Sequence, residues 1–353
     1  MTGKNGSVKT TIMKLVWYVI SGQIVKALME IPFSSITIET SIYTVTVIRV
    51  GDNVCRVKWE SGGKITEFED HYDEDENEVS NAEDVPNRRM KNTGSTLFFP
   101  TFRRIEGGFS SSESTGRSVF VDRSMQPSGD LDGALKALSN KLSSTKHKFV
   151  SALSTSDIEV LLLKQYTDAS EAANKVQQDV SAQMINEIKD FKQDKSEIPP
   201  GSSNISTAAE TALDNIKSMI EKMDNMREAE LAQFNAIRTL VLRIFRHSGI
   251  QVGRLSLGDA LESISSDSLS AGEKQMLSFL CYNAFHSDSV IFIDEPELSL
   301  HIDWQRQLFP TLFSQKKSNQ FIIATHSSFI YSRYPDKEIM LDSDKGDNEQ
   351  EPL

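Results

Sequence analysis

The sequence predicts an α/β fold: a mixed sheet flanked by helices, an antiparallel β subdomain, and an inserted helical hairpin that forms a short coiled-coil arm. Three patterns support this prediction. Val290–Ile293 and Phe321–Ala324 are uninterrupted apolar runs, which is the pattern of buried parallel strands. Residues 36–59 hold three runs of β-forming residues separated by turns. Residues 131–246 place apolar residues at helical spacing over most of their length.

These patterns also predict the domain boundaries. Residues 1–125 form the N-terminal half of one domain, residues 126–250 the helical insertion, and residues 251–341 the C-terminal half. Residues 342–353 are a polar tail. Within the first half, residues 67–84 are dense in Asp and Glu, so we expect a solvated loop there, with an acidic partner-binding patch as the alternative.

The insertion is predicted to be a helical hairpin. A second helical run covers residues 157–192, and the run Ile198–Ser203, with two prolines and a glycine, breaks it. The apolar residues of the first run are Leu131, Leu135, Leu138, Leu142, Phe149 and Leu153. The stripe on the returning helix, residues 206–246, begins with Leu213, Ile216, Ile220 and Met223. The hairpin is either an ordinary helical subdomain or an arm that contacts DNA, a nuclease or a second ATPase.

Composition limits the classes of function. The apolar content of 38% supports a sizeable core, and the net charge of −12 argues against a protein that coats nucleic acid, although a local basic groove is compatible with it. Cys55 and Cys281 are far apart and have no metal-ligand spacing, so we expect a reducing, cytoplasmic setting. Residues 11–29 are apolar but interrupted by two lysines and a glutamine, which predicts a partly buried helix rather than a membrane span.

The chain opens with a pattern close to G-x-x-x-x-G-K-[ST], a loop whose backbone N–H groups bind phosphate. Lys9 would reach the β- and γ-phosphates, and the hydroxyl group of Thr10 would bind Mg²⁺. Val8 stands where the pattern has glycine, and a β-branched side chain restricts the backbone there. The candidate nucleotide-binding residues of this segment are Gly3, Asn5, Gly6, Ser7, Lys9, Thr10 and Thr11.

A second candidate element is the polar turn Leu269–Gln275, which precedes an apolar helix at Met276–Phe285. A serine and a glycine at the N-terminus of a helix offer a hydroxyl and backbone N–H groups to an anion. The candidate nucleotide-binding residues here are Ser270, Gly272 and Glu273.

Two carboxylates follow the first apolar run, where open α/β sheets bind ligands. Asp294 would hold Mg²⁺, and Glu295 would orient and deprotonate the attacking water, since phosphoryl transfer depends on positioning and charge neutralisation. His326 follows the second run and would reach a γ-phosphate. The structural alternatives are a carboxylate pair that caps a strand and a histidine that only supports the fold.

Together these motifs resemble the P-loop, signature motif, Walker B motif, D-loop (Pro296–His301) and switch histidine of the ABC-type ATPases, in the branch with SMC, RecF and OLD-like proteins. The resemblance implies ATP and Mg²⁺ as cofactors. It also implies a head-to-tail dimer, or a higher oligomer, in which Ser270 and Gly272 of one subunit meet the nucleotide held by another. In that family an apolar strand precedes the P-loop, whereas this sequence begins inside the motif.

The segment Leu97–Gly108 runs from an apolar strand into Arg103, Arg104 and Glu106. Similar stretches occur in OLD-like and PtuA-type ATPases, where many ABC ATPases place a metal-contacting Gln; this sequence has no clear Gln there. Either arginine would face phosphate or a partner, or pair with Glu106.

The combination of motifs most resembles the PtuA-type ATPases of Septu and retron anti-phage systems. That resemblance implies an ATPase that gates a separate HNH nuclease, with a retron reverse transcriptase and its RNA–DNA, or other nucleic acid, as further partners, and no membrane. One alternative is a DNA-repair ATPase of the RecF or SMC type that acts on DNA. Another alternative is a scaffold that binds nucleotide without hydrolysis, and the departure from the P-loop pattern at Val8 supports it.

Overall fold

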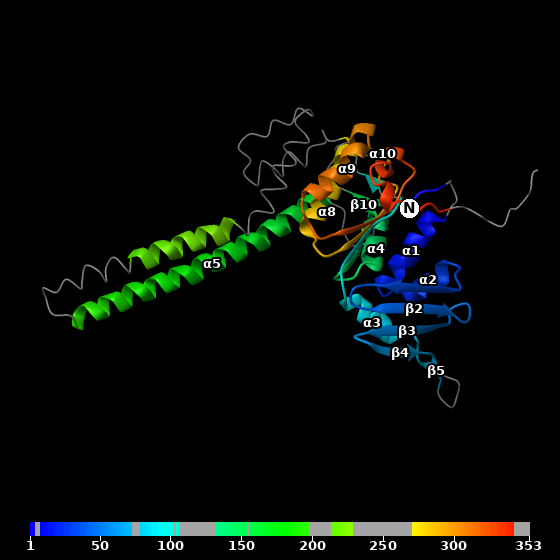
Figure 1. Cartoon of the computed structure of the whole chain (residues 1–353), viewed down its shortest axis with the longest axis horizontal. Coiled ribbons are helices and arrows are strands. Elements are labelled where there is room, and N and C mark those ends of the chain that lie inside the picture. Colours follow the sequence, from blue (N-terminus) through cyan, green and yellow to red (C-terminus); the bar gives the residue numbers. More distant parts are fainter. Residues whose placement is uncertain are drawn as a thin grey trace, which may run out of the picture. The chain divides into compact units, whose positions relative to one another are not determined.

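The structure is a computed structural model that describes residues 1–3, 8–72, 78–101, 104–105, 131–153, 155–197, 213–228 and 270–341 (Figure 1). The contacts divide the chain into two compact units. The first contains Met1–Ser154, Ser270–Phe279 and His286–Leu353, and the second contains Thr155–Leu269 and Leu280–Phe285.

The core of the first unit is a parallel sheet in the order β12-β11-β7-β9. The strands are β7 (Thr96–Phe99), β9 (His147–Phe149), β11 (Val290–Asp294) and β12 (Gln320–Ala324). The prediction of two buried strands at Val290–Ile293 and Phe321–Ala324 is confirmed, and they are neighbours. Their carboxyl ends coincide, since Asp294 lies opposite Ala324. Residues that follow the two strands are therefore brought together at one edge of the sheet.

The first residues of the chain extend this sheet beyond β12. The amino group of Met1 donates to the carbonyl of Ile323 at 2.6 Å, and its carbonyl accepts from the N–H of Thr325 at 3.1 Å. Thr2 forms a parallel bridge with Met340. The backbone that leads into the P-loop thus lies directly beside the strand that leads into His326.

Two helices follow the P-loop, α1 (Lys9–Ile20) and α2 (Ile24–Glu30), where the sequence predicts one. The break is at Gly22, which has φ of 69°. A Cβ there would lie 2.4 Å from the carbonyl oxygen of Asn87, so the turn requires glycine. Trp17 and Met13 of α1 are fully buried and belong to the main core cluster, and α1 contacts β11 and β12.

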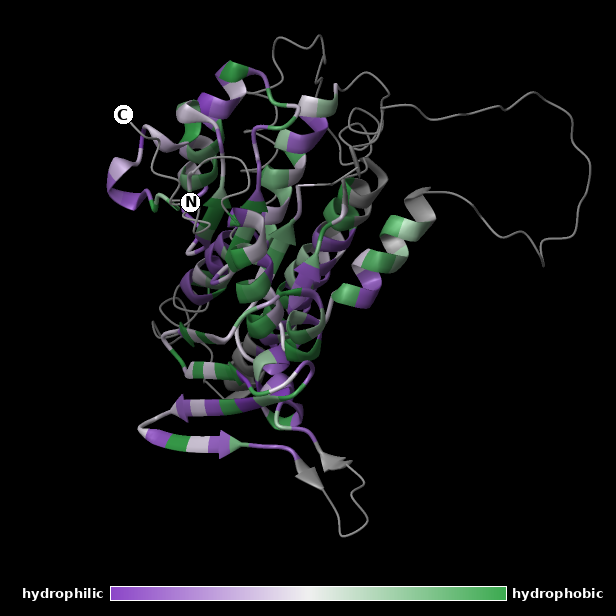
Figure 2. Ribbon diagram, turned by 90° about the vertical axis from the view of Figure 1, so that its right-hand side faces the viewer, coloured by the Kyte–Doolittle hydropathy of each residue, from purple (hydrophilic) through white to green (hydrophobic). Residues whose placement is uncertain are grey.

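An antiparallel sheet in the order β1-β2-β3-β4 follows, so the predicted β subdomain is confirmed. The strands are β1 (Ser35–Glu39), β2 (Thr44–Arg49), β3 (Cys55–Ser61) and β4 (Lys64–Phe68). Hydrophobic and hydrophilic residues alternate along them (Figure 2).

The prediction of a solvated loop at residues 67–84 is wrong for the residues that the structure describes there. The short strands β5 (His71–Tyr72) and β6 (Glu78–Ser80) pair antiparallel within it, and α3 (Asp84–Asn92) begins at its end.

The predicted helical spacing from Leu131 does not continue to Leu153. After α4 (Leu131–Leu142), Phe149 lies in β9, and Leu153 lies in β10 (Ala152–Leu153), which pairs in parallel with β8 (Arg104–Ile105). Sheet pairing with β7 overrides the local pattern. The contacts therefore group residues 131–153 with the first unit, whereas the sequence starts the insertion at residue 126.

His147 on β9 is buried within a hydrogen-bonded chain. Its Nδ1 lies 2.9 Å from Thr96 Oγ1, which also accepts from Trp17 Nε1 at 3.1 Å, and its Nε2 lies 3.0 Å from the carbonyl oxygen of Met90. A carbonyl only accepts, so Nε2 carries the proton and Nδ1 accepts from Thr96. Burial lowers the pKa of His147 and keeps the imidazole neutral.

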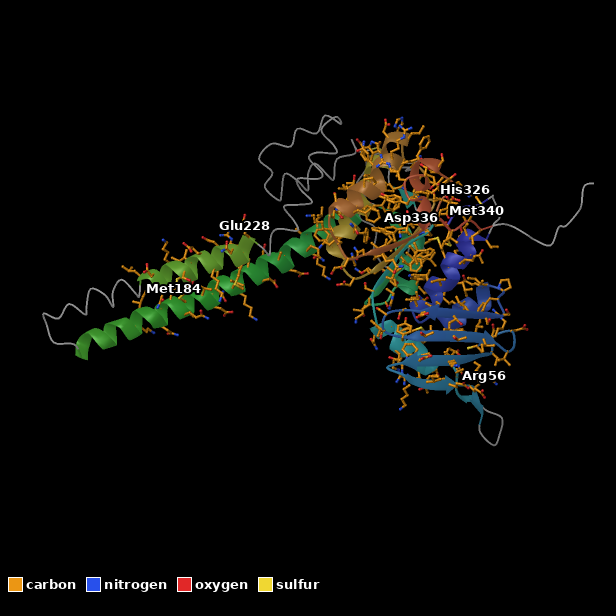
Figure 3. The ribbon with its side chains drawn as sticks, in the orientation of Figure 1. Arg56, Met184, Glu228, His326, Asp336 and Met340 are labelled. Atoms are coloured by element: carbon orange, nitrogen blue, oxygen red, sulfur yellow. The ribbon has the colours of Figure 1, made fainter. Side chains whose placement is uncertain are left out.

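The described part of the second unit contains α5 (Thr155–Glu197) and a helix at residues 213–228 (Figures 1 and 3). The predicted stripe on the returning helix is partly wrong, because Leu213 is 65% and Ile220 42% exposed. The half-buried residues are Ile216, Met219 and Met223. The remainder of the predicted returning helix lies outside the described residues.

Three helices flank the C-terminal strands: α8 (Ala271–Phe285), α9 (Ile302–Ser314) and α10 (Ser328–Tyr331). The predicted apolar helix at Met276–Phe285 is confirmed, and it starts earlier, at Ala271. After α10 the chain forms a 3-10 turn at Pro335–Lys337 and the bridge at Met340. In the part of the chain that the structure describes, no helix has the length and apolar character of a membrane span.

Candidate nucleotide-binding site

Three oxygen-bearing side chains meet at the carboxyl end of β11. Asp294 is fully buried, and its Oδ2 accepts a hydrogen bond of 2.7 Å from the hydroxyl of Thr10. The hydroxyl of Thr101, which follows β7, donates to the same oxygen. Residues from the first helix, the segment after β7 and the end of β11 are thereby brought to one point.

These residues fit a magnesium site. Mg²⁺ prefers oxygen ligands and is usually held by one or two carboxylates together with substrate phosphates. Thr10 and Asp294 are the predicted ligands, and the structure places them in contact. Sequence reasoning missed Thr101. The only local signal was its position just after a strand, in the segment where the resembling ATPases place a metal-contacting Gln.

The described part of the P-loop ends at a buried lysine. Lys9 is 6% exposed, and its Nζ donates to the carbonyl of Gly3 at 3.0 Å, so the ammonium group lies at the base of the loop. Gly3 has φ of 145°, which glycine alone adopts readily. Thr11 lies half-buried in the first turn of α1. The predicted residues Asn5, Gly6 and Ser7 lie outside the described residues.

Val8, the residue that departs from the P-loop pattern, has left-handed backbone angles, with φ of 52° and ψ of 16°. Glycine has no Cβ and reaches this region without penalty, whereas L-residues pay about 1–2 kcal/mol. The side chain is 54% exposed, so the cost arises in the backbone and not from crowding in a core. The P-loop pattern therefore has glycine at this position because glycine adopts the left-handed conformation without cost.

The predicted catalytic pair also comes together. Nε2 of His326 lies 4.0 Å from Oε1 of Glu295, and both side chains are partly exposed. The N–H of Glu295 donates to the carbonyl of Ala324 at 2.8 Å, which anchors it to the end of β12. Glu295 has φ of 49°, an uncommon conformation for a non-glycine residue and one that clusters at functional sites.

The signature residues form the N-terminus of α8. Ser270 is the N-cap: its hydroxyl accepts from the N–H of Glu273 at 3.4 Å, and its own N–H donates to Oε2 of Glu273 at 2.7 Å. Glu273, predicted to bind nucleotide, therefore completes a capping box here. Gly272 approaches the D-loop so closely that a Cβ would lie 2.6 Å from the carbonyl oxygen of Ser299.

A cavity of about 290 Å³ joins the start of the P-loop to the switch histidine, and its lining includes Gly3, His326 and Glu338. His326 and Met340, which also lines it, lie at the same end of the first unit (Figure 3). Gly3, the first glycine of the P-loop pattern, and His326 therefore face a common space.

Together, the fold and the site define a P-loop ATPase domain. The family model described as "AAA domain, putative AbiEii toxin, Type IV TA system" matches residues 136–332, more than half of the 353 residues. The match includes Ser270, Asp294 and His326. The chain belongs to this family of AAA domains.

Among solved structures, the chain is similar to the Smc head domain with an extended coiled coil bound to the C-terminal domain of ScpA, derived from Pyrococcus furiosus. The identity is 14%, over 94% of this chain and 84% of that chain, with a TM-score of 0.32. It is also similar to the SmcHead bound to the C-winged helix domain of ScpA, with 13% identity over 94% of this chain and 82% of that chain, and a TM-score of 0.32. A comparison with curated proteins gives no match.

Proposed function

We propose that this chain binds ATP with Mg²⁺ and hydrolyses it to ADP and phosphate. The hydrogen bond between Thr10 and Asp294 is the observation that supports this most directly, because it joins the P-loop helix to the Walker B strand. Thr10 and Asp294 would hold Mg²⁺, with Thr101 orienting the Asp294 carboxylate, and the ion would supply positive charge to offset that of the phosphates. Lys9 would bind the β- and γ-phosphates, with the loop before it.

Glu295 and His326 would complete the hydrolytic machinery. The Glu295 carboxylate orients the attacking water and accepts its proton, and His326 donates a hydrogen bond to the γ-phosphate. The 4.0 Å separation between the two side chains, beside the cavity that His326 lines, fits these roles.

The second half of each site would come from another copy of the chain. In a head-to-tail dimer, Ser270 and Gly272 of one subunit present a hydroxyl and backbone N–H groups to the nucleotide of the other. Nucleotide binding then closes the dimer, and hydrolysis opens it.

ATP turnover by the purified chain tests the proposal, beside Glu295→Gln and the matched exposed-carboxylate control Glu69→Gln. We expect turnover to fall by at least about 10³-fold in Glu295→Gln, with ATP binding retained, and to persist in the control. Turnover that survives in Glu295→Gln would rule out the assigned role of Glu295.

A nucleotide-binding scaffold without hydrolysis is the second candidate, because Val8 stands where the P-loop pattern has glycine. Under this alternative the parent chain binds ATP without turnover, and Val8→Gly restores hydrolysis. Full activity in the parent would exclude the scaffold.

We further propose that the ATPase acts in the cytoplasm and gates a separate HNH nuclease in anti-phage defence. The motif resemblance supports this, and the family description, which names a toxin of a type IV system, is compatible with it. The helical arm that begins with α5 (Thr155–Glu197) would transmit the change between dimer states. Co-expression with an HNH nuclease encoded beside it should give a complex whose nuclease activity changes with ATP. DNA-stimulated ATPase activity with a steep salt dependence would favour the DNA-repair alternative instead.

A further inference from the structure

The loop that carries His326 is held by the carboxylate of Glu297. Oε1 of Glu297 accepts from the backbone N–H groups of His326 at 2.6 Å and Ser327 at 3.2 Å, and Oε2 accepts from the hydroxyl of Thr325 at 2.8 Å. Hydrogen bonds to an ionised carboxylate are stronger than those between neutral groups. One side chain from the D-loop therefore binds three consecutive residues after β12.

Gln305 on α9 makes a second connection between the same segments. Its Oε1 accepts from the hydroxyl of Ser327 at 2.6 Å, and its Nε2 donates to the carbonyl of Leu300 at 2.9 Å. The amide thus bridges the end of the D-loop and the histidine loop. Because the two bridges come from different elements, the histidine loop is fixed in orientation as well as in position.

The segment that carries Glu297 is in turn fixed to the signature helix. Nε2 of Gln275, a fully buried residue of α8, donates to the carbonyl of Pro296 at 2.8 Å. On the same helix, the close approach of Gly272 to Ser299 leaves no space for a side chain. The D-loop therefore contacts the signature helix on one side and the histidine loop on the other.

We infer that Glu297 is a positioning residue that sets the place of His326 relative to Glu295 and couples His326 to movements of α8. The inference rests on the proposed ATPase function of this site. When α8 shifts, the hydrogen bond from Gln275 carries the D-loop with it, and the Glu297 carboxylate carries the histidine loop. Contact of α8 with the nucleotide of a second subunit would then alter the separation between His326 and Glu295.

Amide hydrogen exchange on the full chain without nucleotide tests directly whether Glu297 restrains the loop that carries His326. The variants are Glu297→Ala, which removes all three hydrogen bonds, and Glu297→Gln, which removes the charge. Asp336→Asn is the matched control, because that exposed carboxylate pairs only with its neighbour Lys337 among the contacts described (Figure 3). We expect exchange at His326 and Ser327 to accelerate at least about tenfold in Glu297→Ala and less in Glu297→Gln.

The amides of β11 should remain within about twofold of the parent in both variants. Unchanged exchange at His326 and Ser327 would overturn the inference, because it would show that Glu297 does not restrain the histidine loop. Equal acceleration throughout the first unit would also overturn it, because it would show a general loss of stability.

Kinetics then tests the consequence for turnover. In Glu297→Gln we expect kcat to fall about tenfold while KM for ATP stays within about twofold, since the phosphate-binding residues are unchanged. A kcat equal to that of the parent would overturn the positioning role. If the parent shows no turnover, the proposed ATPase function fails, whereas the exchange measurement still decides whether Glu297 holds the loop.

Discussion

The hydroxyl group of Thr10 donates a hydrogen bond of 2.7 Å to Oδ2 of Asp294, although the two residues are 284 positions apart in the chain. The bond links the first turn of α1 to the last residue of β11. Thr101 donates to the same oxygen, so two hydroxyl groups converge on one buried carboxylate. A site of this kind is suited to a small divalent cation.

Thr101→Val tests the contribution of the second hydroxyl group. Valine keeps the shape of threonine but removes the donor to Asp294. Because partners that orient metal ligands typically contribute about 10–100-fold to metal affinity, we expect the Mg²⁺ concentration needed for ATP binding to rise by about tenfold or more. Binding of a fluorescent ATP analogue, titrated with Mg²⁺, measures this. Thr37→Val, in the antiparallel sheet where Thr37 pairs with Thr46, is the matched control and should leave the midpoint unchanged.

Val8→Gly should stabilise the chain. Glycine removes the cost of the left-handed conformation at Val8 but adds backbone freedom to the unfolded state, so we expect a net gain of about 0.5–1 kcal/mol in the free energy of unfolding. Urea unfolding measures it. Val25→Gly, at another exposed valine but inside α2, should instead destabilise by about 1 kcal/mol. Equal effects at the two positions would contradict the conformational argument.

Gly272→Ala should disturb the contact between the signature helix and the D-loop. The added methyl group would lie 2.6 Å from the carbonyl oxygen of Ser299, which is backbone and cannot rotate away. We expect a loss of about 1–3 kcal/mol in the free energy of unfolding. Gly51→Ala is the control, since the nearest atom to its Cβ would be Val54 Cβ at 3.5 Å, an ordinary contact. A stable Gly272→Ala chain would show that the helix and the loop separate at little cost.

His147 should make stability fall in mild acid. Burial lowers its pKa below the ordinary value of 6.5, so below that pH the unfolded chain binds a proton that the folded chain does not. The contribution of His147 is therefore fully present above about pH 6.5 and is lost as the pH falls through the folded pKa, at up to about 1.4 kcal/mol per pH unit.

Urea unfolding between pH 7.5 and 5.5 measures this slope. His147→Gln should reduce it, despite a lower stability at neutral pH from the lost hydrogen bonds. A parent slope that survives in His147→Gln would assign the effect to other groups.

The central strands were predictable because their apolar runs are long and end in polar residues. The local sequence of Val290–Ile293 alone predicts a buried strand, and β11 confirms it. β9 was not predictable, because it has three residues, His147–Phe149, whose polar members fit a helix as well as a strand. Only pairing with β7 makes it a strand.

The candidate site shows the same division. The placement of Thr10, Asp294 and His326 was predictable, since each lies at a fixed distance from a recognisable strand or loop. Thr101 and Glu297 were missed because their roles depend on partners that are distant in the sequence, and no local pattern encodes such contacts. The local sequence around Glu273 fits both nucleotide binding and a capping box with Ser270, and the structure shows the capping box.

The strand order β12-β11-β7-β9 has a consequence for the synthesis of the protein on the ribosome. Thr96 pairs with Val290, so β7 meets its central partner only after residues 100–289 have been translated. Until then, the apolar edge of β7 has only β9 beside it. Sheets with such distant pairing fold slowly and leave edges open to wrong partners. The nascent chain therefore passes through a period in which one edge of β7, a strand that is buried along its whole length in the folded chain, is uncovered.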